Sequence, residues 1–109
     1  MRKEKHYSLI KNDIRIDVRF IKEKKRIVHF AINVALLIDG KAEDVFRIDT
    51  AHKGLHVMRF WISTKLKYLE NKRKDDYRYE FNKWKKEVIE NFEKWAEIYR
   101  RTKEGGKYE

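Results

Sequence analysis

The chain has 109 residues, with 28 lysines and arginines against 18 aspartates and glutamates, a formal net charge of +10. This length suits a single domain with one modest core, and the absence of cysteine excludes disulfides and thiolate metal sites. The longest apolar run, residues 34–38, is too short to span a bilayer, and no signal-peptide pattern is present. We therefore expect a soluble, cytoplasmic protein with a polyanionic partner, nucleic acid ahead of an acidic protein.

The first predicted elements are two strands joined by a charged turn. Residues 1–12 are polar and basic, and we interpret them as a basic arm or an edge strand. Apolar side chains alternate with polar ones over residues 13–21, and a second apolar face runs through residues 27–38. A period of two is typical of half-buried strands, so both segments are predicted to enter one sheet. The charged residues 22–26 form the turn between them.

Asp39-Gly40 is a hairpin signal that leads into a third strand, residues 43–50. A strict two-residue loop would turn Phe46 away from the apolar face, because a one-residue slip moves every side chain to the other side of a sheet. We therefore predict a three-residue loop, which pairs Ile32 with Phe46.

A turn that contains Gly54 leads into the fourth strand, residues 55–62. Pairing Ile48 with His56 and Phe46 with Met58 would keep the later apolar residues of this strand on the core face. Residues 63–74 are a connector, and the pattern of its first part suits a short helix and a strand extension equally well.

A long amphipathic helix is predicted over residues 75–104, with Asp75 and Asp76 near the positive end of its dipole. Its aromatic and apolar residues recur at spacings of three and four: Phe81, Trp84, Val88, Phe92, Trp95 and Tyr99. The predicted fold is α+β, a four-stranded antiparallel meander covered on one face by this helix. Trp84, Phe92 and Trp95 should then contact Phe30, Ile32, Phe46 and Phe60.

The sheet face without a helix is the first candidate functional surface. Cations can meet phosphates there, and an aromatic ring can stack on a base, as in proteins that bind single-stranded nucleic acid. Ordinary cross-strand ion pairing, such as Asp49 with an arginine, is the alternative interpretation. The candidate nucleic-acid-binding residues are Arg15, Arg19, Arg47, Lys53, Arg59 and Trp61.

Asp49, His52 and His56 are the candidate catalytic residues. Cleavage of RNA by its own 2′-hydroxyl needs groups that take and return a proton, and histidine titrates in the right range. The two histidines are four residues apart in a loop and a strand, so no metal site and no cofactor is expected. The predicted register sends Asp49 and His56 to opposite faces, and only a twisted or bulged turn would bring them together.

The run from residue 47 to residue 61, RIDTAHKGLHVMRFW, resembles TumE-like toxins of prokaryotic toxin–antitoxin systems and their uncharacterised relatives. These proteins show an Arg-x-Asp-x-Ala-His strand end, a short turn and a His-x-x-Arg-Phe strand, followed by a tryptophan-containing C-terminal helix. Many relatives have histidine where this chain has Met58. The resemblance implies a toxin that acts on RNA, and it assigns no catalytic residue.

Two functions follow as hypotheses. The first is a toxin-like protein that acts on nucleic acid, as a metal-independent ribonuclease of a toxin–antitoxin pair. The second is a non-catalytic nucleic-acid-binding module, or a small interaction protein with an acidic partner. The expected partners are RNA or single-stranded nucleic acid and an acidic antitoxin protein. No membrane partner is expected, and a homodimer is left open.

Overall fold

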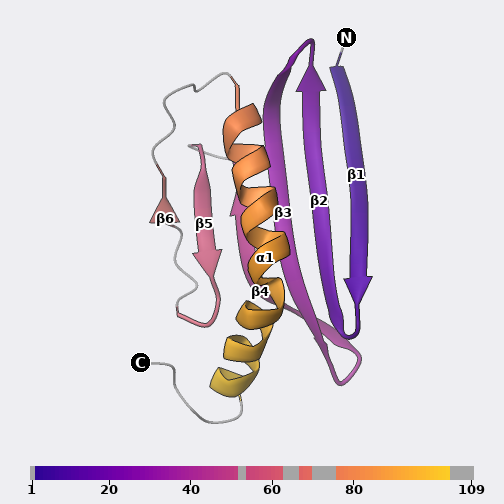
Figure 1. The fold of residues 1–109 in the computed structure, drawn as a ribbon, viewed down its shortest axis with the longest axis vertical. Coiled ribbons are helices and arrows are strands. Elements are labelled where there is room, and N and C mark those ends of the chain that lie inside the picture. Colours follow the sequence, from indigo (N-terminus) through magenta and orange to yellow (C-terminus); the bar gives the residue numbers. More distant parts are fainter. Residues whose placement is uncertain (1, 52–53, 63–66, 70–75, 104–109) are drawn as a thin grey trace.

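The computed structural model describes residues 2–51, 54–62, 67–69 and 76–103. Its sheet is an antiparallel meander whose spatial order follows the chain, and one face carries the single helix of the described residues (Figure 1). The fold class is therefore α+β, as predicted. The elements are β1 Arg2–Lys11, β2 Ile14–Glu23, β3 Arg26–Ile38, β4 Lys41–Asp49, β5 His56–Arg59, β6 Lys67–Tyr68 and α1 Arg78–Lys103.

The sheet has six strands, so the prediction of four is wrong. The basic N-terminal segment is an edge strand, because β1 pairs with β2 along its whole length, from Arg2 opposite Glu23 to Lys11 opposite Ile14. Asn12 makes this tight turn with a φ of 56°. The sixth strand, β6, is a two-residue strand that pairs with β5 inside the predicted connector.

The β3–β4 hairpin corrects the predicted loop. Ile38 pairs with Lys41, so the loop has two residues, Asp39 and Gly40, and both have positive φ. A register shift next to Val34 then adds one residue to β4, so that Val34 lies opposite Phe46. The bulge therefore keeps Phe46 on the apolar face, which is the position that the predicted three-residue loop would also have given it.

The predicted β4–β5 register is wrong by one residue. Ile48 pairs with Val57 and Asp49 pairs with His56. The core positions of this part of the chain are filled by Leu55, Val57 and Trp61. Consequently, the residues predicted to face the core here do not fill it: His56, Met58, Phe60 and Ile62.

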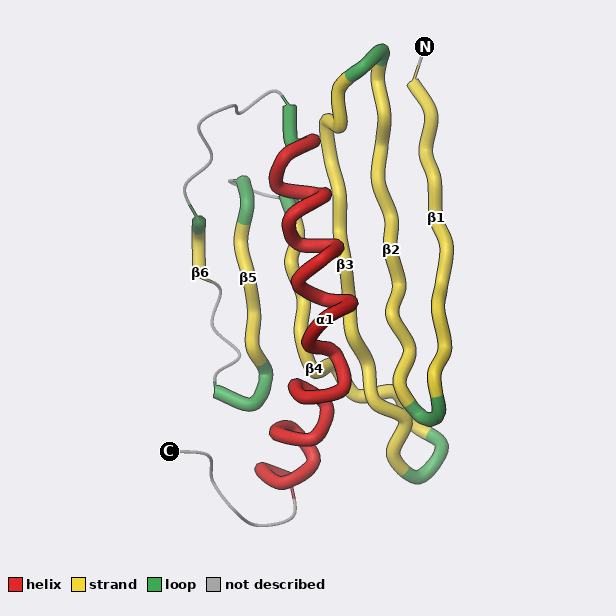
Figure 2. Tube along the Cα trace, in the orientation of Figure 1, coloured by secondary structure: helices red, strands yellow, loops and turns green. Residues whose placement is uncertain are grey.

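The helix lies over β3 and β4 (Figure 2). The helix side of β2 belongs to the same core through Ile14, Ile16 and Val18, whereas every residue of β1 is exposed. Phe46 packs against Trp95 and Trp84, with ring centroids 4.3 and 5.9 Å apart, as predicted. Phe81 packs against Phe30 at 5.3 Å. No helix among the described residues is long and apolar enough to cross a membrane.

The start of the helix is fixed to the sheet by a single carboxylate. Asp76 Oδ1 accepts hydrogen bonds from the backbone N–H groups of Arg78 at 3.1 Å and Ile27 at 3.3 Å. The Tyr77 N–H in turn donates to the Ile27 carbonyl at 2.8 Å. Asp76 is therefore both the cap of the helix and its anchor to β3.

Candidate nucleic-acid interface

The face of the sheet opposite α1, called the uncovered face below, carries a row of side chains across all six strands, and all but one of them are polar. The strand registers align one residue from each strand: His6, Arg19, Ala31, Asp49, His56 and Tyr68. A neighbouring row holds Ser8, Asp17, Asn33, Arg47 and Met58. These two rows contain four of the predicted site residues: Arg19, Arg47, Asp49 and His56.

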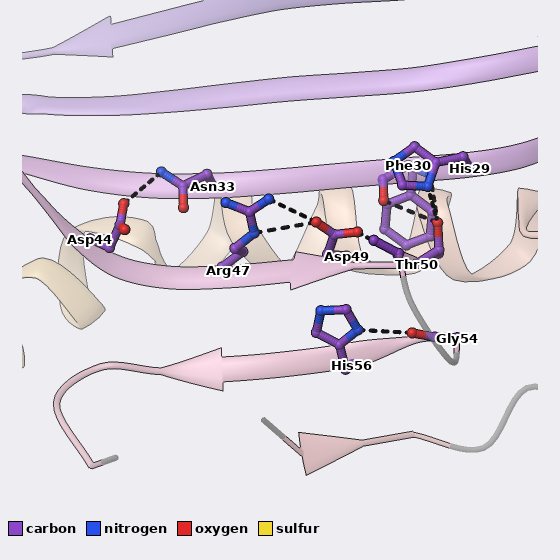
Figure 3. A network of polar contacts seen from close by, with 10 residues as sticks. His29, Phe30, Asn33, Asp44, Arg47, Asp49, Thr50, Gly54 and His56 are labelled. Carbon is purple, nitrogen blue, oxygen red and sulfur yellow. Dashed lines mark hydrogen bonds and ion pairs between the residues drawn. The ribbon is translucent and has the colours of Figure 1, made fainter. Parts of the chain in front are cut away.

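Asp49 is buried and fully engaged (Figure 3). Its Oδ2 accepts hydrogen bonds from Arg47 Nη2 at 2.8 Å and Nε at 3.3 Å, and its Oδ1 accepts the Ala51 N–H at 2.6 Å. Burial alone would raise the pKa of Asp49, but the hydrogen bonds from Arg47 and Ala51 outweigh it and hold that pKa below its ordinary value. Asp49 is therefore an anion that positions Arg47 and the turn after β4.

His56 lies across from Asp49 on the neighbouring strand, as Figure 3 shows. Its Nδ1 is 2.8 Å from the Gly54 carbonyl oxygen, so the Nδ1–H donates there and this nitrogen carries a proton. The imidazole is buried, and the ring of Tyr68 lies 5.6 Å away. The structure thus brings Asp49, His56 and Arg47 together, while His52 and Lys53 lie outside the described residues.

The placement of Arg59 and Trp61 on the uncovered face is wrong. Arg59 lies opposite Phe46, whose side chain is in the core under the helix. Trp61 is buried, and its ring stacks on Trp95 at 5.9 Å. The one-residue register error explains both corrections, because it exchanges the two faces of every residue in β5. Trp61 is therefore a core residue and offers no stacking platform.

A shallow hollow of about 240 Å³ lies in the middle of the uncovered face. Ala31 is the smallest of the residues that line it, and polar groups make up the rest: His6, Asp17, Arg19, Asn33 and Arg47. Asn33 Nδ2 donates to Asp44 at 3.1 Å, whereas its buried Oδ1 has no hydrogen-bond donor among the described residues. The hollow therefore combines two guanidinium groups with an unused acceptor.

Sequence reasoning missed His6 because it left residues 1–12 open as a basic arm or an edge strand and predicted no pairing partner for them. The signal was present: with a tight turn at residues 12–13, His6 falls opposite Arg19 and on the same face. His6 is exposed at the hollow, unlike His56.

The cations of the uncovered face are largely paired. Arg15 Nε lies 3.0 Å from Asp17 Oδ2, Arg47 is held by Asp49, and Arg2 Nε is 3.9 Å from Glu23 Oε2. Arg19 is exposed and makes no ion pair within the described ranges. The cross-strand pairing that we considered as an alternative is therefore present, and Arg19 is the exception to it.

Thr50 holds the end of β4 in place (Figure 3). Its Oγ1 accepts the Phe30 N–H at 3.0 Å and lies 2.7 Å from His29 Nδ1. Burial lowers the pKa of His29, although the Asp49 charge opposes that shift. This network fixes where β4 ends, and with it the position of the Asp49 carboxylate.

The whole chain was compared with protein families, curated proteins and solved structures. Residues 1–105 match the model of one family, described as Domain of unknown function (DUF7718). No curated protein and no solved structure matches the chain.

In the part of the chain that the structure describes, no group of three or more histidine and acidic side chains could hold a metal ion.

Proposed function

Since the chain belongs to the family described as Domain of unknown function (DUF7718), we propose its function from its site: it acts on single-stranded RNA, which binds at the uncovered face. The observation that carries the proposal is the hollow, where Arg19 and Arg47 converge beside His6 and Asn33. Arginine is suited to phosphate, because its planar fork of donors matches the geometry of phosphate oxygens.

The two arginines have different parts in this proposal. Arg47 gives Nε and Nη2 to Asp49, which holds the side chain in place and leaves Nη1 for a phosphate oxygen. Arg19 has no competing carboxylate in the described chain, so its whole guanidinium is open to a ligand. The unpaired Asn33 Oδ1 would accept an N–H group, such as the exocyclic amino group of a base.

Side-chain NMR tests this proposal directly. We expect the Nε–Hε signals of Arg19 and Arg47 to shift on titration with a short single-stranded RNA. In this proposal both guanidinium groups contact the phosphate, Arg47 through Nη1, and binding changes the environment of the whole group. The Nε–Hε signal of Arg101 is the control, since that side chain lies on the helix and bonds Glu97 at 3.1 Å. Shifts confined to residues outside the uncovered face would refute the proposal.

RNA cleavage by a toxin-like, metal-independent ribonuclease is the second candidate. The observation that favours it is the β4–β5 register, which places His56 beside the Asp49–Arg47 pair. His6 cannot act on the same phosphate as His56, because they lie on β1 and β5, and four strand spacings amount to about 19 Å. Catalysis at His56 would also require the Tyr68 ring to move, since the imidazole is buried.

Cleavage is tested with RNA and its 2′-deoxy counterpart in the presence of a chelator. If the protein is a ribonuclease of this kind, only the RNA is cut, and His56→Ala lowers the rate at least tenfold while His6→Ala does not. Arrest of growth on expression should then disappear with the same substitution. Intact RNA leaves RNA binding as the function, and equal cutting by the His56→Ala variant excludes His56 from an acid–base role.

A further inference from the structure

A second hollow, of about 350 Å³, lies on the helix side of the sheet, between the start of α1 and the ends of β2 and β3. Phe20 and Ile27 form its apolar part. Its polar lining consists of Lys22, Lys25, Arg78 and Asn82, and it contains no carboxylate. This cation-lined groove differs in that respect from the uncovered face, where acidic side chains accompany the arginines.

The strand register brings further lysines to the groove. Lys3 lies opposite Lys22 and Lys5 opposite Phe20, so both project to the helix side of β1. From the helix, the Lys85 ammonium lies 5.0 Å from the centre of the Phe81 ring, which itself packs on Phe20 at 4.9 Å. The helix covers β3 and β4 but not β1, which leaves this side of β1 exposed.

These cations are not neutralised within the described parts of the chain. None of the lysines around the groove makes an ion pair there: Lys3, Lys5, Lys22, Lys25 and Lys85. Arg78 gives Nε to Asp76 Oδ2 at 2.8 Å, so its other nitrogens remain for a ligand. Unpaired lysines attract the phosphates of a nucleic-acid backbone, and a half-buried aromatic ring offers a surface for its bases. The groove has both.

The groove and the first hollow lie back to back across β1 and β2. Arg19 and His6 line the hollow, and the next residues of the same strands, Phe20 and Lys5, lie on the groove side. Because β1 is the edge of the sheet, a single strand that leaves the hollow around this edge would reach the groove without crossing another element.

We propose that the cation-lined groove is a second phosphate-binding surface, which holds the backbone of the same RNA whose phosphate occupies the hollow. This inference rests on the proposed function of the uncovered face. The hollow orients one phosphate through arginines that are held in place, and the groove supplies affinity through unpaired lysines. Short RNA fills the hollow alone, and longer RNA occupies both.

The test compares a charge reversal in the groove with a matched one outside it. Lys5→Glu/Lys22→Glu changes the groove, and Lys86→Glu/Lys94→Glu changes the net charge equally on exposed positions of α1. We expect the groove variant to bind a 20-nucleotide single-stranded RNA at least tenfold more weakly than the control variant. Its salt dependence should also flatten, by about 0.7 in the log–log slope for each RNA phosphate that the variant no longer neutralises.

The length of the RNA separates this inference from the proposed function. A trinucleotide should bind the groove variant and the wild type equally, whereas Arg19→Glu should weaken both lengths. Equal affinity of the groove and control variants for the long RNA overturns the second surface and leaves the hollow intact. Tighter binding of polyglutamate than of RNA, abolished in the groove variant, also overturns it, in favour of an acidic protein segment.

Discussion

At the scale of single residues, Asp49 has the clearest structural role. Its carboxylate accepts three hydrogen bonds, two from Arg47 and one from Ala51, and so it fixes both a candidate phosphate ligand and the turn after β4. The sequence pattern placed Asp49 on the uncovered face, where the structure has it, but sent its neighbour His56 to the core face. That placement depends on a register that the apolar pattern of β5 described wrongly.

The lowered pKa of Asp49 predicts a pH dependence of stability. Because this pKa is lower in the folded than in the unfolded chain, the ionised carboxylate stabilises the fold above about pH 4, its pKa in unfolded chains. That contribution is lost as the pH falls through the folded-state pKa. We expect Asp49→Asn to lower the free energy of unfolding at pH 7 by about 1–3 kcal/mol, since the charged partner of Arg47 is removed.

Urea unfolding at pH 7 and at pH 3 measures this effect. The difference between wild type and Asp49→Asn should shrink at the lower pH, where the wild-type carboxylate is being protonated. Ile10→Ala is a control outside the Asp49 network, because this apolar side chain is 70% exposed on the edge strand. A difference that stays constant with pH would show that Asp49 acts through shape and not through charge.

At the scale of elements, the helix and the first strands were predictable and the pairing beyond them was not. The aromatic spacing in α1 predicts a helix with one face packed on the sheet, and Phe46 packs on Trp84 and Trp95 as expected. The β3–β4 pairing depends on a bulge, which leaves no mark in an alternating pattern. In β5, both alternating sets contain apolar residues, so the pattern could not choose between the two faces.

Trp95 tests the packing of α1 on the sheet. Its ring lies between Phe46 and Trp61, and it is buried, so Trp95→Ala should lower the free energy of unfolding by about 3–5 kcal/mol. Tyr79→Ala, in the same helix but 72% exposed, should change it by less than about 0.5 kcal/mol. Similar small losses for both variants in denaturant unfolding would mean that the helix is not held by this aromatic cluster.

At the scale of the whole molecule, the net charge of +10 is unevenly placed. The sequence pattern predicted phosphate-binding cations on the uncovered face, yet the arginines there are mostly paired with carboxylates. Lysines without ion partners in the described chain gather instead on the helix side of β1 and β2. Charge counts along the chain cannot reveal this, because neighbouring residues of a strand point to opposite faces.

The central claim is that the uncovered face binds single-stranded RNA, and the affinity of one variant tests it most directly. Arg19 is exposed and has no ion partner in the described chain, so Arg19→Glu removes a phosphate ligand without leaving a buried charge unpaired. Lys94→Glu makes the same change of net charge on an exposed position of α1. In fluorescence anisotropy with a labelled trinucleotide RNA, Arg19→Glu should bind at least tenfold more weakly than Lys94→Glu, a difference of about 1.4 kcal/mol. Equal affinities of the two variants at the same salt concentration would contradict the claim.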